Sequence, residues 1–249
     1  MGKPITPSWV AYGESGTDIS VGEKAKYQRN KMYDVKRIIG KKYKEVQDIK
    51  SRVYYSIIAG QNDEVLIEPF GDNSSAVPTK KPEEISSKIL SECKLIAEKA
   101  LGNASGKQEV KKAVVTVPAY FDTSQKNATA DACKIAGLEL LRLITEPTAA
   151  AVAYGYHRSI GPDDEPRNIL VFDLGGGTYD VSCIVANHGM LDVQAVSGDA
   201  RLGGRDWDEV LVDLLVEKLR DEHEEEIVQN DETMVALQIL CERAKMDLS

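Results

Sequence analysis

The sequence predicts an α/β protein with mixed sheets, and three observations support this class. Apolar, β-branched runs alternate with helical patterns along residues 1–160. Three further β-type runs, at residues 169–174, 179–186 and 191–197, are joined by short glycine-containing turns and predict an antiparallel meander. The polar, proline-bearing stretch at residues 161–167 predicts a boundary between two lobes, residues 1–162 and 163–249.

The first 80 residues predict a small mixed region. Short strands are expected at residues 8–12, 19–22, 52–58 and 64–69, and a short helix is expected at residues 23–29. Residues 34–40 read DVKRIIG, which predicts a basic amphipathic turn closed by Gly40.

Helices and strands then alternate up to the boundary. Pro82 is expected to open a helix that ends at Gly102, and Pro118 to end a buried strand at residues 113–117. Asp122, followed three residues later by Gln125, predicts a capped helix that runs to residue 136. A strand at residues 138–145 and a helix of small residues at 148–156 complete the pattern.

Two helices follow the meander. The first is expected at residues 206–223, after Gly203 and Gly204, with a core-facing stripe of Val210, Leu211, Leu214, Leu215 and Leu219. The second is expected at residues 232–249, with Met234, Leu237, Cys241, Ala244 and Leu248 as its core stripe. Its opposite flank carries Gln238, Glu242, Lys245 and Ser249, which form either a solvated face or a binding face.

The most informative stretch is ILVFDLGGGTYD at residues 169–180. Its fully apolar first half predicts a buried, central strand, and its glycines are expected to supply positive φ angles and backbone amides for an anion such as phosphate. The carboxylates of Asp173 and Asp180 flank this loop, which is consistent with Mg²⁺ held through water between them and the phosphates. An ordinary glycine-rich hairpin is the alternative.

Composition excludes several classes of protein. A net charge of −9 argues against nucleic acid as the main partner, and no apolar run is long enough for a membrane helix. The four cysteines are scattered within apolar patterns, which predicts reduced, buried thiols in a cytoplasmic protein. Three isolated histidines support neither a histidine-based metal site nor a Ser-His-Asp triad.

Several blocks, taken together, resemble the ATPase domain of the seventy-kilodalton heat-shock (DnaK-type) chaperones. The blocks are DVKRIIG at residues 34–40, AVVTVPAYF at 113–121, IAGLELLRLITEPTAAAVAYG at 135–155, ILVFDLGGGTYDV at 169–181, GDARLGGRDWD at 198–208 and CERAK at 241–245. They occur in the family's order and span nearly the whole chain. The resemblance implies an actin-like, ribonuclease H-like fold of two lobes with ATP in the cleft between them.

The resemblance also implies roles for individual residues. Lys36 matches the catalytic lysine, Glu146 the acidic residue near the attacking water, and Asp173 and Thr178 further catalytic positions. Asp173 matches a position that holds Mg²⁺ through water, and Asp180, the other carboxylate beside the loop, is expected to share that ion. Pro118 and Lys126 match positions of an interlobe switch. Residues that match the nucleotide-binding positions are Gly175, Gly176, Gly177, Thr178, Gly203, Gly204, Glu242, Lys245 and Ser249.

The sequence departs from the family pattern at both ends. It lacks a first phosphate loop of D-L-G-T-T type and the peptide-binding domain, so we expect a nucleotide-binding domain truncated at both ends, with weak ATP binding. Arg205 stands where most members have Glu, Lys126 where Arg is usual, and Met246 where Arg stacks on adenine.

The resemblance implies an ATP-dependent chaperone ATPase that uses ATP/ADP and Mg²⁺ to drive protein folding in the stress response. It implies J-domain co-chaperones and nucleotide-exchange factors as partners, and unfolded clients only through the missing domain. The main alternative is a non-hydrolysing nucleotide-binding or co-chaperone-like module, which the missing phosphate loop favours. A sugar kinase or actin-like filament protein is a weaker alternative, because a shared fold does not fix function.

Overall fold

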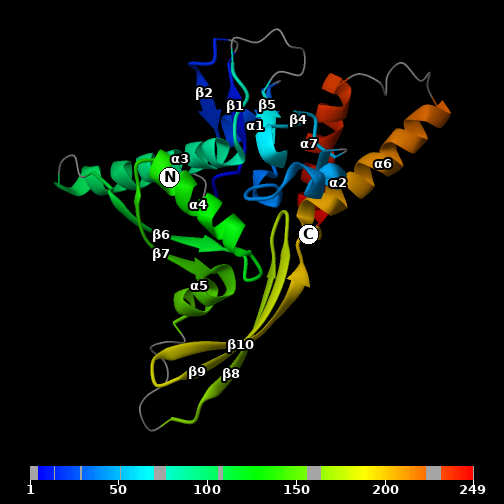
Figure 1. The fold of residues 1–249 in the computed structure, drawn as a ribbon. Helices are drawn as coiled ribbons and strands as arrows, with labels where there is room; N and C mark the ends of the chain where they lie inside the picture. Colours follow the sequence, from blue (N-terminus) through cyan, green and yellow to red (C-terminus); the bar gives the residue numbers. More distant parts are fainter. Residues whose placement is uncertain are drawn as a thin grey trace. The chain divides into compact units, whose positions relative to one another are not determined.

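The computed structural model describes residues 5–13, 15–28, 30–50, 52–69, 77–105, 109–155, 164–222 and 231–248 (Figure 1). Its contacts divide the chain into two compact units, residues 1–146 and 147–249. The sequence places the lobe boundary later, between residues 162 and 163, and those two residues lie outside the described ranges. That boundary therefore stays a prediction.

The first unit begins with short strands around a small core. Strands β1 (Val10–Tyr12), β2 (Ile19–Val21) and β3 (Lys31–Met32) form an antiparallel sheet in the order β2-β1-β3. Strands β4 (Ser56–Ala59) and β5 (Val65–Glu68) form an antiparallel pair, so β4 begins four residues later than the sequence predicts. The short helices between the strands are α1 (Glu23–Lys26), η1 (Val35–Arg37), η2 (Tyr43–Glu45), α2 (Gln47–Lys50) and η3 (Gln61–Asp63).

These short elements are held together by a dense apolar core. Met32, Ile38, Ile57, Ile67 and Ile85 all have 0% exposure and belong to one cluster of buried side chains. Removal of this much apolar surface from water is the main stabilising contribution to such a unit. The core explains why strands of only two to four residues persist here, since such short strands are marginal in isolation.

The second half of this unit is a β-α-β arrangement. Strands β6 (Lys112–Val117) and β7 (Glu139–Thr145) are parallel and connected by helix α4 (Thr123–Ile135), which packs on helix α3 (Pro82–Ser105). Helix α3 begins at Pro82 as predicted but passes through Gly102 to Ser105. The predicted buried strand is wrong for β6, because its residues alternate between exposed and partly buried, and Val114 is 52% exposed.

The predicted capping of α4 is confirmed in both directions. The backbone N–H of Gln125 donates to Oδ1 of Asp122 over 2.8 Å, and the N–H of Asp122 donates to Oε1 of Gln125 over 3.3 Å. Gly40 packs against the same helix end with a φ of 71°, and a Cβ at this position would lie 2.5 Å from Cα of Gln125. Glycine is therefore required where the DVKRIIG turn meets α4.

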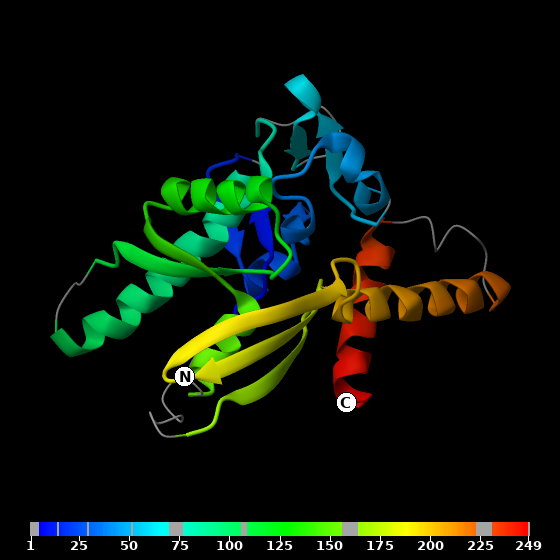
Figure 2. The same ribbon diagram turned by 60° about the horizontal axis from the view of Figure 1, so that its bottom comes forward.

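The second unit contains the predicted meander. Strands β8 (Arg167–Leu174), β9 (Tyr179–Asn187) and β10 (Met190–Asp199) form an antiparallel sheet in the order β10-β9-β8 (Figures 1 and 2). The α/β prediction is thus confirmed. The prediction that the apolar strand is buried and central is wrong, because β8 lies at the edge of the sheet and Leu170 is 65% exposed.

In the described residues, the helices around this sheet are α5 (Glu146–Ala153), α6 (Gly204–Glu222) and α7 (Asp231–Leu248). The predicted core stripe of α6 is wrong in detail, since Val210 and Leu214 are more than half exposed and Val212 is buried. Of α7's predicted stripe, Cys241 is buried but Leu248 is 86% exposed. Among the described residues, no helix is both long and apolar enough to span a membrane.

The cysteines divide into two pairs by exposure. Cys133 and Cys241 are buried, as predicted, but Cys93 and Cys183 are exposed, which corrects the expectation for those two. All four are free thiols. Burial raises the pKa of Cys133 and of Cys241, and so keeps these two thiols protonated near neutral pH.

Candidate functional site

The glycine loop joins β8 to β9 as a tight hairpin turn. The N–H of Gly175 donates to the carbonyl of Thr178 over 2.9 Å, and Thr178 itself is buried. The expected positive φ is wrong for Gly175 and Gly176, since neither adopts one. The Gly175 amide is also engaged within the turn, so fewer amides face a potential anion than the sequence suggests.

The N-terminus of α6 packs directly on this loop. The N–H of Gly204 donates to the carbonyl of Gly175, and the N–H of Arg205 to that of Gly176, both over 2.9 Å. A Cβ on Gly203 would lie 2.6 Å from backbone atoms of Gly176 and Gly177. Such an approach is possible only without a side chain, so the glycine before α6 is explained by close backbone packing.

Asp173 and Asp180 lie directly opposite each other at the loop end of β8 and β9. Asp180 is 1% exposed, whereas Asp173 is partly buried. Two carboxylates on opposed positions repel each other, and a hard divalent cation with its waters would offset this repulsion. Among the described residues, no three His, Cys, Asp or Glu side chains gather as a metal site. The pair therefore fits Mg²⁺ held largely by water and by ligand oxygens, rather than a closed protein cage.

Lys245 of α7 contacts the first turn of α6, where that helix packs on the glycine loop. Its Nζ donates to the carbonyl of Gly204 over 2.6 Å and lies 2.7 Å from Oδ1 of Asp208. Burial raises the pKa of the Asp208 carboxyl above its usual value, although the Lys245 ammonium opposes this shift. This flank of α7 is consequently not a solvated face. No local sequence signal distinguishes Asp208, although it lies in the GDARLGGRDWD block at residues 198–208.

The remaining residues predicted on α7 differ in their placement. Glu242 is partly buried on the same helix, whereas Met246 is 66% exposed. Ser249 lies outside the described residues, so its predicted place among the nucleotide-binding residues stays a prediction.

In the first unit, Lys36 and Glu146 come together although they are 110 residues apart in the sequence. Nζ of Lys36 donates to both carboxylate oxygens of Glu146, over 2.8 and 2.9 Å. Lys36 belongs to η1, after Asp34 with its φ of 55°, and Glu146 directly follows β7. Their side chains are 45% and 20% exposed, so a ligand in solution can reach the pair.

The two residues predicted for the interlobe switch lie on neighbouring elements of the first unit. Pro118 follows β6 and is fully buried, and Lys126 lies in the first turns of α4. Within the described part of the chain, the Lys126 side chain has no ion pair, so the switch role stays a prediction.

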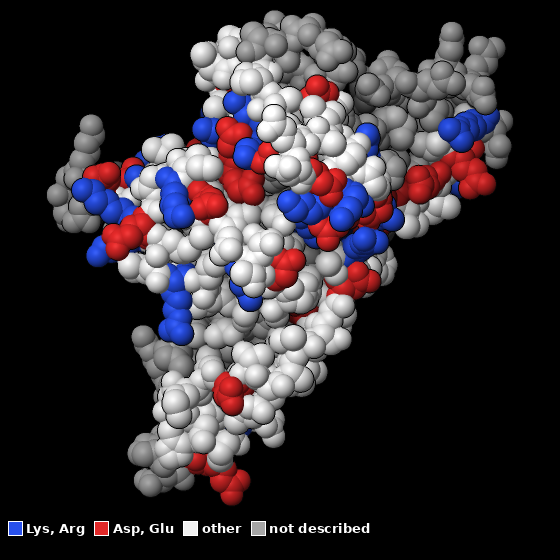
Figure 3. All heavy atoms as spheres, in the orientation of Figure 1, with Lys and Arg blue, Asp and Glu red and all other residues white. Residues whose placement is uncertain are grey.

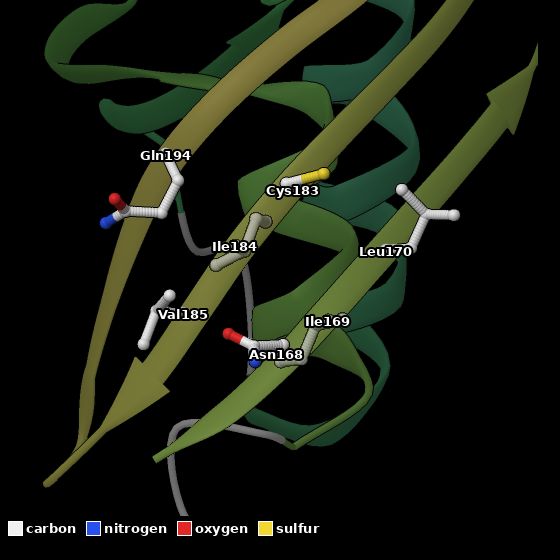
Figure 4. Close-up of a pocket in the computed structure, with 7 residues that line it drawn as sticks. All are labelled: Asn168, Ile169, Leu170, Cys183, Ile184, Val185 and Gln194. Atoms are coloured by element: carbon white, nitrogen blue, oxygen red, sulfur yellow. The ribbon is translucent and has the colours of Figure 1, made fainter.

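One cavity lies away from all the predicted positions, on the sheet of the second unit (Figure 4). It has a volume of about 300 Å³ and opens between β8, β9 and β10. The residues that line it are mostly apolar: Asn168, Ile169, Leu170, Cys183, Ile184, Val185 and Gln194. The apolar pattern of β8 gives no sign of this cavity, because such a pattern predicts a strand at the centre of a covered sheet.

Comparisons with known proteins agree on one group of relatives. A profile of the family described as Hsp70 protein matches residues 1–249. Over its whole length, the chain is 42% identical to the Heat shock 70 kDa protein of Neurospora crassa and 40% identical to the Chaperone protein DnaK of Thermus thermophilus. It is also 40% identical to Heat shock 70 kDa protein 2 of Paracoccidioides lutzii. The chain spans 37–38% of the length of these relatives.

Proposed function

The chain belongs to the Hsp70 family, and we propose that it forms part of an ATPase domain that binds Mg²⁺-ATP and hydrolyses it. The observation that carries this proposal is the Lys36–Glu146 pair. A lysine can stabilise the charge on a transferred phosphoryl group and a carboxylate can position the attacking water, and here two such residues, distant in the sequence, are held against each other.

In this proposal, Lys36 stabilises the negative charge that develops on the transferred phosphoryl group. Glu146 orients the attacking water and accepts its proton. The bidentate contact holds Lys36 in place before ATP binds, so that less conformational entropy is lost when the ligand arrives.

The glycine loop of the second unit is proposed as the phosphate-binding element. Thr178 and the loop backbone contact the phosphates, and the contact with Gly203 fixes the loop on α6. Asp173 and Asp180 are the residues that would hold Mg²⁺ through its waters. When bound, Mg²⁺ neutralises phosphate charge. Glu242 and Lys245 are proposed to contact the adenosine.

Single-turnover phosphate release from the 249-residue chain with Mg²⁺-ATP tests the catalytic assignment. We expect Lys36→Ala and Glu146→Gln each to lower the rate at least about 100-fold, because each removes a group that acts in the transition state. Lys44→Ala is the matched control, since Lys44 is an exposed lysine of η2 in the same unit. Equal rates for Lys36→Ala and Lys44→Ala would show that Lys36 is not catalytic.

A second function, nucleotide binding without hydrolysis, is favoured by the hydrogen bonds that already occupy backbone amides in the glycine loop and at the start of α6. The amides of Gly175, Gly204 and Arg205 are already bonded within the chain and are not available to a phosphate. Isothermal titration with Mg²⁺-ATP separates the two proposals. Binding without phosphate release by the unmodified chain would support this second function and contradict the first.

We further propose that hydrolysis serves a chaperone, because two relatives carry the names heat shock protein and chaperone. Partners of such a protein would be J-domain co-chaperones, nucleotide-exchange factors and unfolded client proteins. Phosphate release measured with and without an added J-domain protein tests this. An unchanged rate would argue against that partner for this chain.

A further inference from the structure

Gly204 and Asp208 lie about one helical turn apart at the start of α6, and so on the same face of that helix. The ammonium group of Lys245, on α7, contacts both of them. Its Nζ is 2.6 Å from the carbonyl oxygen of Gly204 and 2.7 Å from Oδ1 of Asp208. A Cβ on Gly204 would be only 3.2 Å from this Nζ. The glycine therefore lets the ammonium group lie directly on the backbone of α6.

These two contacts leave part of the ammonium group available. An ammonium group has three N–H donors, of which the Gly204 carbonyl takes one and the Asp208 carboxylate takes another. The Lys245 side chain is 30% exposed, whereas that of Asp208 is 13% exposed. A ligand in solution can therefore contact the ammonium group, while its carboxylate partner is largely covered.

Asp208 differs from the acidic residues farther along α6. Asp213 is exposed, and Figure 3 shows acidic groups on the surface over this helix, at the upper right. A covered carboxylate, by contrast, loses hydration and needs a cation beside it. Arg205, on the same helix, contacts Glu209 at 4.0 Å. Lys245 contacts Asp208 at 2.7 Å, so it is the cation that offsets the charge of this covered carboxylate.

We propose that Asp208 is a positioning residue for nucleotide binding: it holds the Lys245 ammonium group against Gly204, with the remaining N–H donor directed to the nucleoside part of ATP. The inference rests on the proposed contact of Lys245 with adenosine. Because Asp208 offsets the charge of the ammonium group, the pair offers a hydrogen-bond donor with little net charge. Such a donor suits the uncharged oxygen and nitrogen atoms of a nucleoside better than the phosphates.

Gly204 connects this ion pair to the glycine loop. Its N–H donates to the carbonyl of Gly175, and its own carbonyl accepts from Lys245, so one residue contacts both parts of the proposed site. The hydrogen bond between Gly204 and Gly175 involves backbone atoms only and does not depend on Asp208. Loss of Asp208 should therefore release Lys245 and leave the glycine loop in place.

Acetylation of the 249-residue chain by acetic anhydride, followed by mass spectrometry, tests the first step without nucleotide. We expect Asp208→Ala to speed the acetylation of Lys245 at least about threefold, because a lysine released from its carboxylate extends more freely into solvent. Lys218, an exposed lysine of α6, is the internal reference. Asp213→Ala, at an exposed aspartate of the same helix, is the matched control and should leave the acetylation of Lys245 unchanged.

Isothermal titration then compares Mg²⁺-ATP with Mg²⁺-tripolyphosphate, which has phosphates but no nucleoside. We expect Asp208→Ala and Lys245→Met each to raise the Kd for Mg²⁺-ATP about tenfold, because a charge-assisted hydrogen bond to the nucleoside is lost. The Kd for Mg²⁺-tripolyphosphate should change by less than about twofold. A merely structural role, in packing α6 on α7, would weaken the binding of both ligands. Asp208→Asn keeps the shape of the side chain and serves the same test if Asp208→Ala folds poorly.

The two assays separate failure of this inference from failure of the proposed function. Equal acetylation of Lys245 with and without Asp208 would overturn the inference, whether or not ATP binds. So would equal weakening of both ligands by Asp208→Ala, or a loss of ATP affinity in Lys245→Met that Asp208→Ala does not share. Faster acetylation in Asp208→Ala, together with no binding of ATP by the unmodified chain, would support the fixing of Lys245 by Asp208 and contradict the proposed function instead.

Discussion

The small core of the first unit and the sheet of the second unit stabilise their strands in different ways. In the first, strands of two to four residues surround side chains with no exposure, such as Ile57 and Ile67. In the second, strands of eight to ten residues form a long ladder, yet Leu170 and Phe172 remain mostly exposed. Burial therefore dominates in one region, and backbone pairing in the other.

The two regions should therefore be sensitive to different kinds of substitution. A region that depends on burial loses stability when a buried side chain is shortened. A region that depends on backbone pairing tolerates side-chain loss, but not an obstacle between closely packed backbones. Gly203 is such a position, because its Cα packs on the backbone of Gly176 and Gly177.

The largest expected effect is Ile57→Ala, compared with Leu170→Ala in the second unit. The first should lower the free energy of unfolding of its unit by about 2–5 kcal/mol, and the second should change that of its unit by less than about 0.5 kcal/mol. Each unit contains one tryptophan, Trp9 or Trp207, so urea unfolding can be followed separately in Trp207→Phe and Trp9→Phe backgrounds. Similar losses for both substitutions would contradict the comparison.

The next effect is Gly203→Ala, compared with Gly176→Ala. A Cβ on Gly203 would be 2.6 Å from the loop backbone, whereas one on Gly176 would meet nothing within 4 Å. We expect Gly203→Ala to destabilise the second unit by about 1–3 kcal/mol and Gly176→Ala to be nearly neutral. Urea unfolding followed by Trp207 fluorescence measures both. Equal stability of the two variants would show that the loop moves away from α6 without cost.

A smaller effect is expected from Asp122→Ala, which removes the cap of α4. The lost hydrogen bond to the Gln125 amide should lower the stability of the first unit by about 1 kcal/mol. Asp131→Ala is the control, because Asp131 lies on the same helix in an exposed pair with Lys134. If circular-dichroism melts show the same loss of stability for Asp122→Ala and Asp131→Ala, the capping hydrogen bond contributes no more to stability than an exposed surface charge does.

The smallest effect concerns pH and Asp208. Its folded-state pKa is raised by burial, so the folded protein binds the proton more tightly than the unfolded chain does. The contribution of Asp208 to stability should therefore fall as the pH rises from about 4 through its folded pKa. Asp208→Asn should flatten this part of the curve of unfolding free energy against pH. A steeper curve in Asp208→Asn would mean that Lys245 outweighs burial.

Local signals predicted several elements correctly. The capping pair Asp122 and Gln125, the start of α3 at Pro82 and the three-strand meander are all confirmed. These signals depend on residues within a few positions of one another, which the sequence contains directly. The place of β8 at a sheet edge, and the burial of Val212 instead of Val210, depend on what packs against each element, so the apolar pattern could not decide them.

By itself, the sequence determined the α/β class, the hairpin at the glycine loop and the family to which the chain belongs. Only the tertiary structure joined Lys36 to Glu146, set Lys245 against Asp208 and required glycine at position 203. Propensities and turns act over a few residues. Contacts between distant residues follow from the packing of whole elements, in which a few tenths of an ångström decide whether a side chain fits.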